Sequence, residues 1–241
     1  MDPAPPPDVN VRAKKNVFVV LLSEVRVWPA MAGIAHDTAS NELDGRARSL
    51  VTSGAVAEAA TLVLRALGPE VWGFVAGVMR SDVDADEVFA TTSERFWRSL
   101  DRFEWRCSLR TWLHVLARHE MDRFHRGARR HVRGRVRISE LADAIAAVKT
   151  DTMSRRRASA RRKLDRLRDE LAPDDRALLV LRVDRELAWD EIALAFAPDA
   201  ERCSDAERTR EAARLRKRFQ LIKKRIAERA REEGLLGGGE P

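Results

Sequence analysis

The sequence predicts an all-α protein built from two small helical domains joined by a basic, flexible linker. Apolar residues recur three and four positions apart through most of the chain, and no segment shows the two-residue alternation of a β-strand. The chain has 241 residues, of which 44% are hydrophobic. That is enough for two modest cores of roughly 70 to 80 residues each.

Residues 1–54 are expected to form a weakly ordered extension. Four of the first seven residues are proline, and no sustained periodicity follows. A short apolar run resembles a secretory signal, but Glu24 and Arg26 interrupt it, so we expect neither a signal nor insertion into a membrane. Met31 is an alternative to Met1 as the translation start, because the sequence that follows it is typical of a continuous soluble protein.

The first helical domain is expected over residues 55–130. Helical spacing runs from about Val56 to Met79, and Gly68-Pro69 marks a break between two helices. An acidic, cap-like stretch at 82–86 opens the next helix. After a loop at 101–108, a further helix runs to about residue 126, with an apolar stripe made of Leu109, Trp112, Leu113, Leu116, Met121 and Phe124.

The second helical domain is expected over residues 162–234, after a linker at 131–161 and before a disordered tail at 235–241. Pro173 occupies a favourable first-turn position for a helix that reaches about Val183. Two more helices are expected, at about Trp189–Phe196 and about Asp205–Glu232.

The charge balance favours a polyanionic partner. Lys and Arg number 45 against 38 Asp and Glu, and the isoelectric point is about 10.1. A solvated basic face explains the same excess, so the count alone does not choose between them. The linker arginines fit either contact with phosphates or simple solvation; they are Arg129, Arg130, Arg133, Arg135, Arg137, Arg155, Arg156, Arg157, Arg161 and Arg162.

The sequence does not predict an enzyme. It has no phosphate-binding loop, no dinucleotide fingerprint, no zinc-protease motif and no plausible Ser/His/Asp grouping. Cys107 and Cys203 lie far apart and outside metal-ligand spacing, so we expect neither a disulfide framework nor a metal site. These features fit a cytoplasmic protein without cofactors.

A series of short runs between residues 82 and 126 resembles a known family. It consists of DADEV at 84–88, RFW at 95–97, LDRF at 100–103, LRTWL at 109–113 and AR at 117–118. The series resembles region 2 of the sigma-70 family of RNA polymerase sigma factors, and it looks most like the extracytoplasmic-function subfamily. The resemblance implies a non-catalytic factor that binds core RNA polymerase and promoter DNA, with an anti-sigma factor as a further partner.

The resemblance implies two sites in the first domain. The polymerase-binding residues would be Asp84, Asp86, Glu87, Val88 and Arg95. The minus-ten DNA-binding residues would be Phe103, Trp105, Arg110, Trp112, Arg118, His119 and Arg123, which are the aromatic and basic types that trap an unstacked base and hold its backbone. His119 fits equally a solvated surface histidine, and Ala90 and Ser93 depart from the residues usual in the family.

Residues 171–226 resemble region 4 of the same family, which contains a helix-turn-helix. Leu215, Phe219, Ile222 and Ile226 would form the buried stripe of its recognition helix. The minus-thirty-five DNA-binding residues would then be Arg216, Lys217, Gln220, Lys223 and Lys224, and a solvated basic helix is the plainer alternative. The turn at 197–214 is about a dozen residues longer than is usual in the family.

The sequence therefore predicts a sigma factor that directs promoter recognition and transcription initiation. The alternative is a helix-turn-helix regulator, or a sigma-like protein, that acts without promoter melting.

Overall fold

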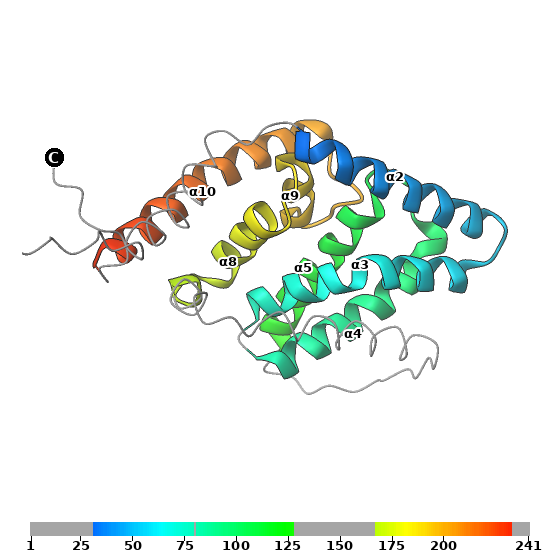
Figure 1. Cartoon of the computed structure of the whole chain (residues 1–241), viewed down its shortest axis with the longest axis horizontal. Coiled ribbons are helices and arrows are strands. Elements are labelled where there is room, and N and C mark those ends of the chain that lie inside the picture. The colour runs from blue at the N-terminus through cyan, green and yellow to red at the C-terminus, as the bar shows by residue number, and fades with distance from the viewer. Residues whose placement is uncertain (1–30, 80, 128–166, 233–241) are drawn as a thin grey trace, which may run out of the picture.

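The computed structural model describes residues 31–79, 81–127 and 167–232 (Figure 1). Every regular element within these ranges is a helix, which confirms the all-α prediction. The linker at 131–161, its arginine clusters and the tail at 235–241 lie outside the described residues. In chain order the elements are α2 (Met31–Thr52), α3 (Val56–Val78), α4 (Asp82–Ser99), η1 (Leu100–Arg102), α5 (Leu109–Gly127), α8 (Pro173–Leu179), η3 (Val180–Asp184), α9 (Trp189–Phe196) and α10 (Asp205–Glu232).

Helix α2 corrects the expectation of weak order up to residue 54. The helix contacts α3 and α5, and its Ala47 is fully buried in the core that they share. The carboxylate of Asp44 accepts a hydrogen bond from the backbone N–H of Leu109, at 3.2 Å from Oδ1, and so satisfies one free donor at the start of α5. Small and polar residues dominate α2, so tertiary contacts rather than a strong apolar stripe hold it.

Helix α3 is continuous through Pro69, so the predicted break at Gly68-Pro69 is wrong. A proline inside a helix removes one backbone hydrogen bond and costs about 3 kcal/mol. The burial of Val71, Trp72 and Val75 on the core side offsets that cost. By length and composition alone α3 could cross a membrane, but half of its apolar window is buried inside the fold, as in the core helix of a soluble protein.

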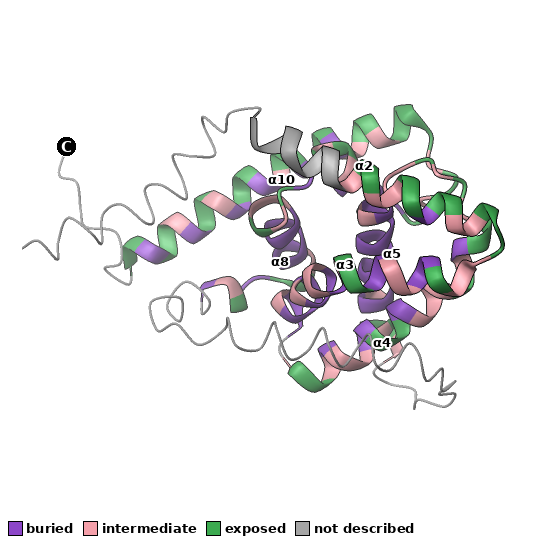
Figure 2. Cartoon of the chain, turned by 45° about the vertical axis from the view of Figure 1, so that its right-hand side comes forward, coloured by how far each residue is buried: buried purple, intermediate pink, exposed green. Residues whose placement is uncertain are grey.

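Helices α4 and α5 complete the N-terminal unit, which we define as α2 to α5. Ser81 begins α4, because its hydroxyl accepts a hydrogen bond from the backbone N–H of Asp84 at 3.2 Å. The predicted stripe of α5 packs in the core, and Figure 2 shows this helix as a largely buried column.

The C-terminal unit, α8 to α10, follows the prediction closely. Pro173 lies in the first turn of α8, and the bounds predicted for the last two helices agree with those of α9 and α10. The long turn is mostly helix, since α10 already begins at Asp205. A capping box explains this start: Ser204 N donates to Glu207 Oε2 at 2.9 Å, and Glu207 N donates to Ser204 Oγ at 3.3 Å.

The two units pack directly against each other. Helices α8 and α9 lie between α10 and the N-terminal unit (Figure 1), where α9 contacts α5 and α8 contacts α3. The buried residues of both units form one continuous apolar cluster. The sequence predicted two helical units, and the structure adds a shared core between them.

Candidate polymerase and nucleic-acid interfaces

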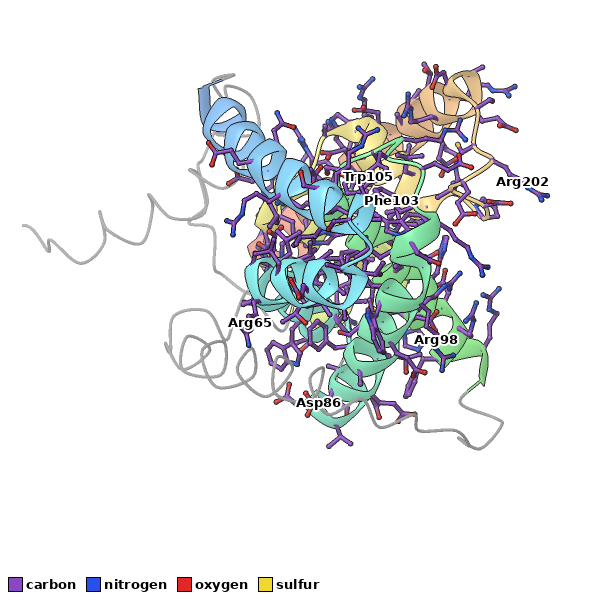
Figure 3. The ribbon with its side chains drawn as sticks, turned by 90° about the vertical axis from the view of Figure 1, so that its right-hand side faces the viewer. Arg65, Asp86, Arg98, Phe103, Trp105 and Arg202 are labelled. Atoms are coloured by element: carbon purple, nitrogen blue, oxygen red, sulfur yellow. The ribbon has the colours of Figure 1, made fainter. Side chains whose placement is uncertain are left out.

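The N-terminal half of α4 carries the predicted polymerase-binding acids. Asp84, Asp86 and Glu87 are half-buried, and Asp86 accepts a hydrogen bond from Trp72 Nε1 at 3.0 Å. Figure 3 shows Asp86 at the lower edge of the molecule, away from Phe103. The acids thus lie at one end of the helix on an accessible surface.

One predicted feature of this surface needs correction. Val88 is only 2% exposed and lies in the core, so it cannot touch a partner in this arrangement. Val83, which is 75% exposed, supplies the apolar surface beside the acids instead. The four-residue spacing between Val83 and Glu87 places them on one helical face, a signal that the sequence offered.

Two further residues of the α4 region make contacts within the fold. Ser93 is fully buried, and its hydroxyl donates a hydrogen bond to Phe89 O at 2.8 Å, so its small size reflects core packing. Arg95 donates to Glu120 Oε1 at 2.7 Å and joins α4 to α5.

The loop before α5 holds an aromatic cluster. The ring centroid of Phe103 lies 5.2 Å from that of Trp105 and 5.5 Å from that of Trp112, and Figure 3 shows Phe103 and Trp105 side by side. Trp105 has a φ of 59°, a left-handed conformation that is unfavourable for a bulky residue. The guanidinium of Arg48 lies 5.5 Å from the Trp105 ring. Trp105 is therefore held at the surface by its neighbours against its own backbone preference.

Arg110 begins a half-buried charge network on α5. It donates two hydrogen bonds to Glu70 Oε1, from Nε at 2.9 Å and from Nη2 at 2.5 Å. Burial alone would raise the pKa of Glu70, but the hydrogen bond from Arg110 and the nearby positive charges outweigh burial and lower it. The neighbouring His114 is fully buried, and burial lowers its pKa to about 4 despite the attraction of Glu70. Glu70 is thus charged and His114 neutral at pH 7.

Arg118 and His119 lie further along α5, facing the C-terminal unit. Arg118 is 6% exposed, donates to Asp174 Oδ1 at 2.5 Å, and lies 4.8 Å above the ring of Phe196. His119 Nε2 donates to Ala197 O at 2.8 Å, and burial lowers the pKa of this imidazole, so it is the neutral form that makes the bond. His119 is therefore a half-buried contact residue in this structure and not a solvated one.

The predicted minus-ten residues divide into two groups. Arg110, Trp112, Arg118 and His119 are buried or half-buried at the contact between the two units, and Trp112 is 7% exposed. Phe103 and Trp105 are partly exposed, and Arg123 is exposed and pairs with Glu120 at 3.1 Å. The predicted residues of the aromatic loop are thus partly accessible, whereas those on α5 are covered except for Arg123.

Residues 63–131 match the family model for sigma-70 region 2. The match begins within α3 and spans α4, the aromatic loop and α5. This segment is similar to sigma-70 region 2. A region 2 domain binds core RNA polymerase and promoter DNA, so the match supports a sigma-70 family sigma factor. It covers less than a third of the chain, and no curated protein matches the sequence.

Outside the region 2 match, α10 presents the predicted minus-thirty-five residues on its open side. Arg216, Lys217, Gln220 and Lys224 are exposed, whereas Lys223 is half-buried with its ammonium 5.5 Å from the Phe219 ring. The buried stripe of Leu215, Phe219, Ile222 and Ile226 is as predicted. Figure 2 shows buried and exposed residues alternating along this helix.

A cavity of about 550 Å³ lies where the region 2 loop meets the turn before α10. Phe103, Trp112 and Cys107 line it from region 2, and Cys203 lines it from the C-terminal unit. Arg106 bridges the two sides by donating a hydrogen bond to Glu201 O. Sequence reasoning missed this cavity, because it exists only where the two units meet.

Proposed function

We propose that the chain is a sigma factor of the extracytoplasmic-function subfamily, which binds core RNA polymerase in the cytoplasm and directs promoter recognition without catalysis of its own. The observation that carries the proposal is the region 2 match over α3 to α5. These helices hold an acidic surface at one end and an aromatic and basic surface at the other. Regulation by an anti-sigma factor is part of the proposal through the family resemblance.

The acidic end of α4 would bind the polymerase. Asp84 and Glu87 offer charge, and Val83 offers apolar area beside them. A surface of this kind suits an amphipathic partner helix with basic flanks. Arg95 would act indirectly, because its salt bridge to Glu120 fixes α4 against α5.

The aromatic loop and α5 would open the minus-ten element. Trapping an unstacked base requires a flat apolar surface and nearby cations for its backbone. Phe103 and Trp105 provide the rings, and Arg110, Arg118 and Arg123 provide the cations. The left-handed backbone at Trp105 supports a functional role, since strain of this kind persists where the ring position matters.

The exposed face of α10 would contact the minus-thirty-five element. Helix α9 packs across α10, with the ring of Trp189 5.6 Å from that of Phe219, and the short turn at 197–204 joins them. Arg216, Lys217 and Gln220 point to solvent from the stretch that follows. Long cations and an amide on one open helical face suit phosphates and base edges in a major groove.

One observation favours a second candidate function. Among the described residues the α10 face is exposed while most of the α5 face is covered, so this arrangement presents α10 to DNA more fully than α5. A helix-turn-helix regulator, or a sigma-like protein that acts without promoter melting, would use this exposed face alone.

Binding to core polymerase distinguishes the two candidates. The full-length protein is mixed with bacterial core RNA polymerase, passed over a size-exclusion column and tested for transcription from genomic fragments. Co-elution with specific transcripts supports the sigma factor. Failure to co-elute, together with salt-sensitive DNA binding by the protein alone, would overturn it in favour of the regulator.

Charge reversal tests whether α4 makes the contact. Asp84→Lys should weaken binding to polymerase by tenfold or more, because it removes an acid from the interface and adds a repelling charge. Glu58→Lys is the control, because Glu58 is an exposed acid in the first turn of α3, just as Asp84 is a half-buried acid in the first turn of α4. Equal loss in both variants would show a general electrostatic effect and not a docking site.

A further inference from the structure

Helix α2 contacts the aromatic loop at two points, although it lies before the region 2 match. The match begins at residue 63, whereas α2 ends at Thr52. The carboxylate of Asp44 accepts a hydrogen bond from the backbone N–H of Leu109, where the loop ends and α5 begins. One helical turn further along α2, the guanidinium of Arg48 lies 5.5 Å from the ring centroid of Trp105, in the middle of the loop. The four-residue spacing places Asp44 and Arg48 on one face of α2, and that face meets the loop.

The loop is fixed at its ends by hydrogen bonds and in its middle by side chains. At one end the backbone N–H of Phe103 donates to Leu100 O at 3.3 Å, and at the other the N–H of Thr111 donates to Ser108 Oγ at 3.1 Å. In the part of the chain that the structure describes, no backbone N–H of residues 104–107 takes part in a backbone hydrogen bond. The conformation in the middle of the loop therefore depends on what its side chains contact.

The contact between Arg48 and Trp105 is well suited to hold this part of the loop. A bulky residue with a φ of 59° is strained, and such strain persists only where the surroundings determine the conformation. Tryptophan is the aromatic residue that attracts a guanidinium most strongly. Among the described residues no carboxylate pairs with Arg48, so its charge is available to the ring. The Phe103 ring, 5.2 Å from that of Trp105, supports the same ring within the loop.

The orientation of the Trp105 ring matters for the capture of a base. A base of single-stranded DNA gains from stacking only where an aromatic face is accessible and already held in place. Trp105 is half-buried and Arg48 is exposed beside it (Figure 3). A residue that fixes this ring therefore contributes to binding of the strand through the ring.

We propose that α2 belongs to the strand-binding site: Arg48 is a positioning residue that holds the Trp105 ring where a base of single-stranded DNA stacks on it. The inference rests on the proposed function only for the identity of that strand as part of the minus-ten element. Arg48 acts through Trp105 and not through a contact of its own with DNA. The site thus extends beyond the region 2 match into a helix that the sequence pattern assigned to a weakly ordered extension.

Hydroxyl-radical labelling of Trp105, measured by mass spectrometry, tests whether Arg48 holds the ring. Arg48→Met keeps an apolar stem but removes the charge, and it should raise the labelling of Trp105 about two- to fivefold, as expected when an exposed cation–π contact is lost. Arg48→Lys keeps a cation over the ring and should stay near the wild type. Arg46→Met is the matched control, because Arg46 is exposed on the same helix and two residues away, where it does not share the face of Arg48. Equal labelling of Arg48→Met and the wild type would overturn the proposal.

Binding of a short, fluorescent single-stranded DNA of random sequence to the full chain tests the link to the strand. The titration is run at high salt, where phosphate contacts weaken and stacking remains. Arg48→Met should bind this probe about two- to fivefold more weakly than the wild type, and Arg48→Lys should restore most of the loss. In a Trp105→Gly background, Arg48→Met should have no further effect, because the ring through which it acts is gone.

Three results of this titration would overturn the proposal. Equal losses in Arg46→Met and Arg48→Met would show a general attraction between the protein and DNA. A loss that persists in the Trp105→Gly background would show that Arg48 contacts DNA directly. Absence of binding by the wild type would show that the loop does not capture a base. Trp105→Ala replaces Trp105→Gly if the latter does not fold by circular dichroism.

Co-elution with core polymerase, measured on the same preparations, separates this proposal from the proposed function. Failure to co-elute, with a loss of DNA binding in Arg48→Met that depends on Trp105, would remove the sigma factor and leave the role of α2 standing. Co-elution, with equal DNA binding by Arg48→Met and the wild type, would remove the role of α2 and leave the sigma factor.

Discussion

Arg118 on α5 and Asp174 on α8 form a hydrogen-bonded ion pair of 2.5 Å across the contact between the two helical units. Arg118 also pairs with Asp122 one turn along its own helix, and Asp174 lies 3.8 Å from Arg218 on α10. This chain of alternating charges links three helices that are far apart in sequence. It joins the candidate minus-ten surface to the helix that carries the candidate minus-thirty-five surface.

Asp174→Asn should destabilise the protein by about 1 to 2 kcal/mol, because the buried guanidinium of Arg118 loses a charged partner. The measurement is urea unfolding followed by circular dichroism. Asp184→Asn is the control: Asp184 pairs with Arg168 within the C-terminal unit, so its loss should cost less than about 1 kcal/mol. Equal effects of the two changes would show that the contact between the units adds nothing.

Ser204→Ala should destabilise the protein by about 1 kcal/mol, because it removes the hydroxyl that accepts from Glu207 N at the start of α10. Chemical denaturation measures the change, and hydrogen exchange should locate faster opening in the first turns of α10. Ser49→Ala is the control, since Ser49 lies exposed inside α2, where alanine is a good helix former. If Ser204→Ala left both measurements unchanged, the capping box would not explain the early start of α10.

His114 should make the protein less stable as pH falls from about 6.5 towards about 4. Its folded pKa is lowered to about 4 from an ordinary value of 6.5, so the unfolded chain takes up a proton in this window and the folded chain does not. The loss should approach about 1 kcal/mol per pH unit.

The measurement is the free energy of unfolding at several pH values in the wild type and in His114→Gln, which should lose most of this slope. Arg110, Arg185 and Glu70 surround the imidazole, and Glu70 stays charged through most of the window because its own pKa is lowered. His125→Gln, at an exposed position, should keep the wild-type slope. An unchanged slope in His114→Gln would assign the acid sensitivity to another group.

Trp105→Gly should separate stability from function. Glycine accepts the left-handed backbone at this position, so relief of strain offsets the lost ring contacts and stability should change by no more than about 1 kcal/mol. Transcription from a promoter found with the wild type should fall at least tenfold, because a stacking surface for the open strand is gone. Trp105→Ala keeps the strain and should be the less stable of the two. Normal transcription by Trp105→Gly would exclude the ring from promoter opening.

Local patterns predicted the helices of the C-terminal unit well. The spacing of Leu215, Phe219 and Ile226 marked the buried side of α10, and Pro173 marked the start of α8. The same spacing on α5 identified its core residues. These predictions succeeded because three- and four-residue periodicity reports directly which side of a helix is buried.

Other elements were not predicted correctly from the sequence, for physical reasons. The residues of α2 are mostly small or polar, so its order depends on contacts such as that between Asp44 and the start of α5. Pro69 predicted a break between two helices, but the burial of α3 against its neighbours outweighed that local preference, and the helix is continuous. The sequence pattern placed Val88 in an acidic docking surface, yet in the structure Val88 is buried and Val83 is exposed.

The sequence by itself determined the all-α class, the buried stripes of α5 and α10, and the residue types that match sigma-70 region 2. Only the tertiary structure decided that the two units share a core and that Arg110, Arg118 and His119 meet acceptors from the C-terminal unit. Periodicity shows which side of a helix avoids water, but the partner that covers it is set by contacts between residues distant in the chain, and no local pattern records those contacts.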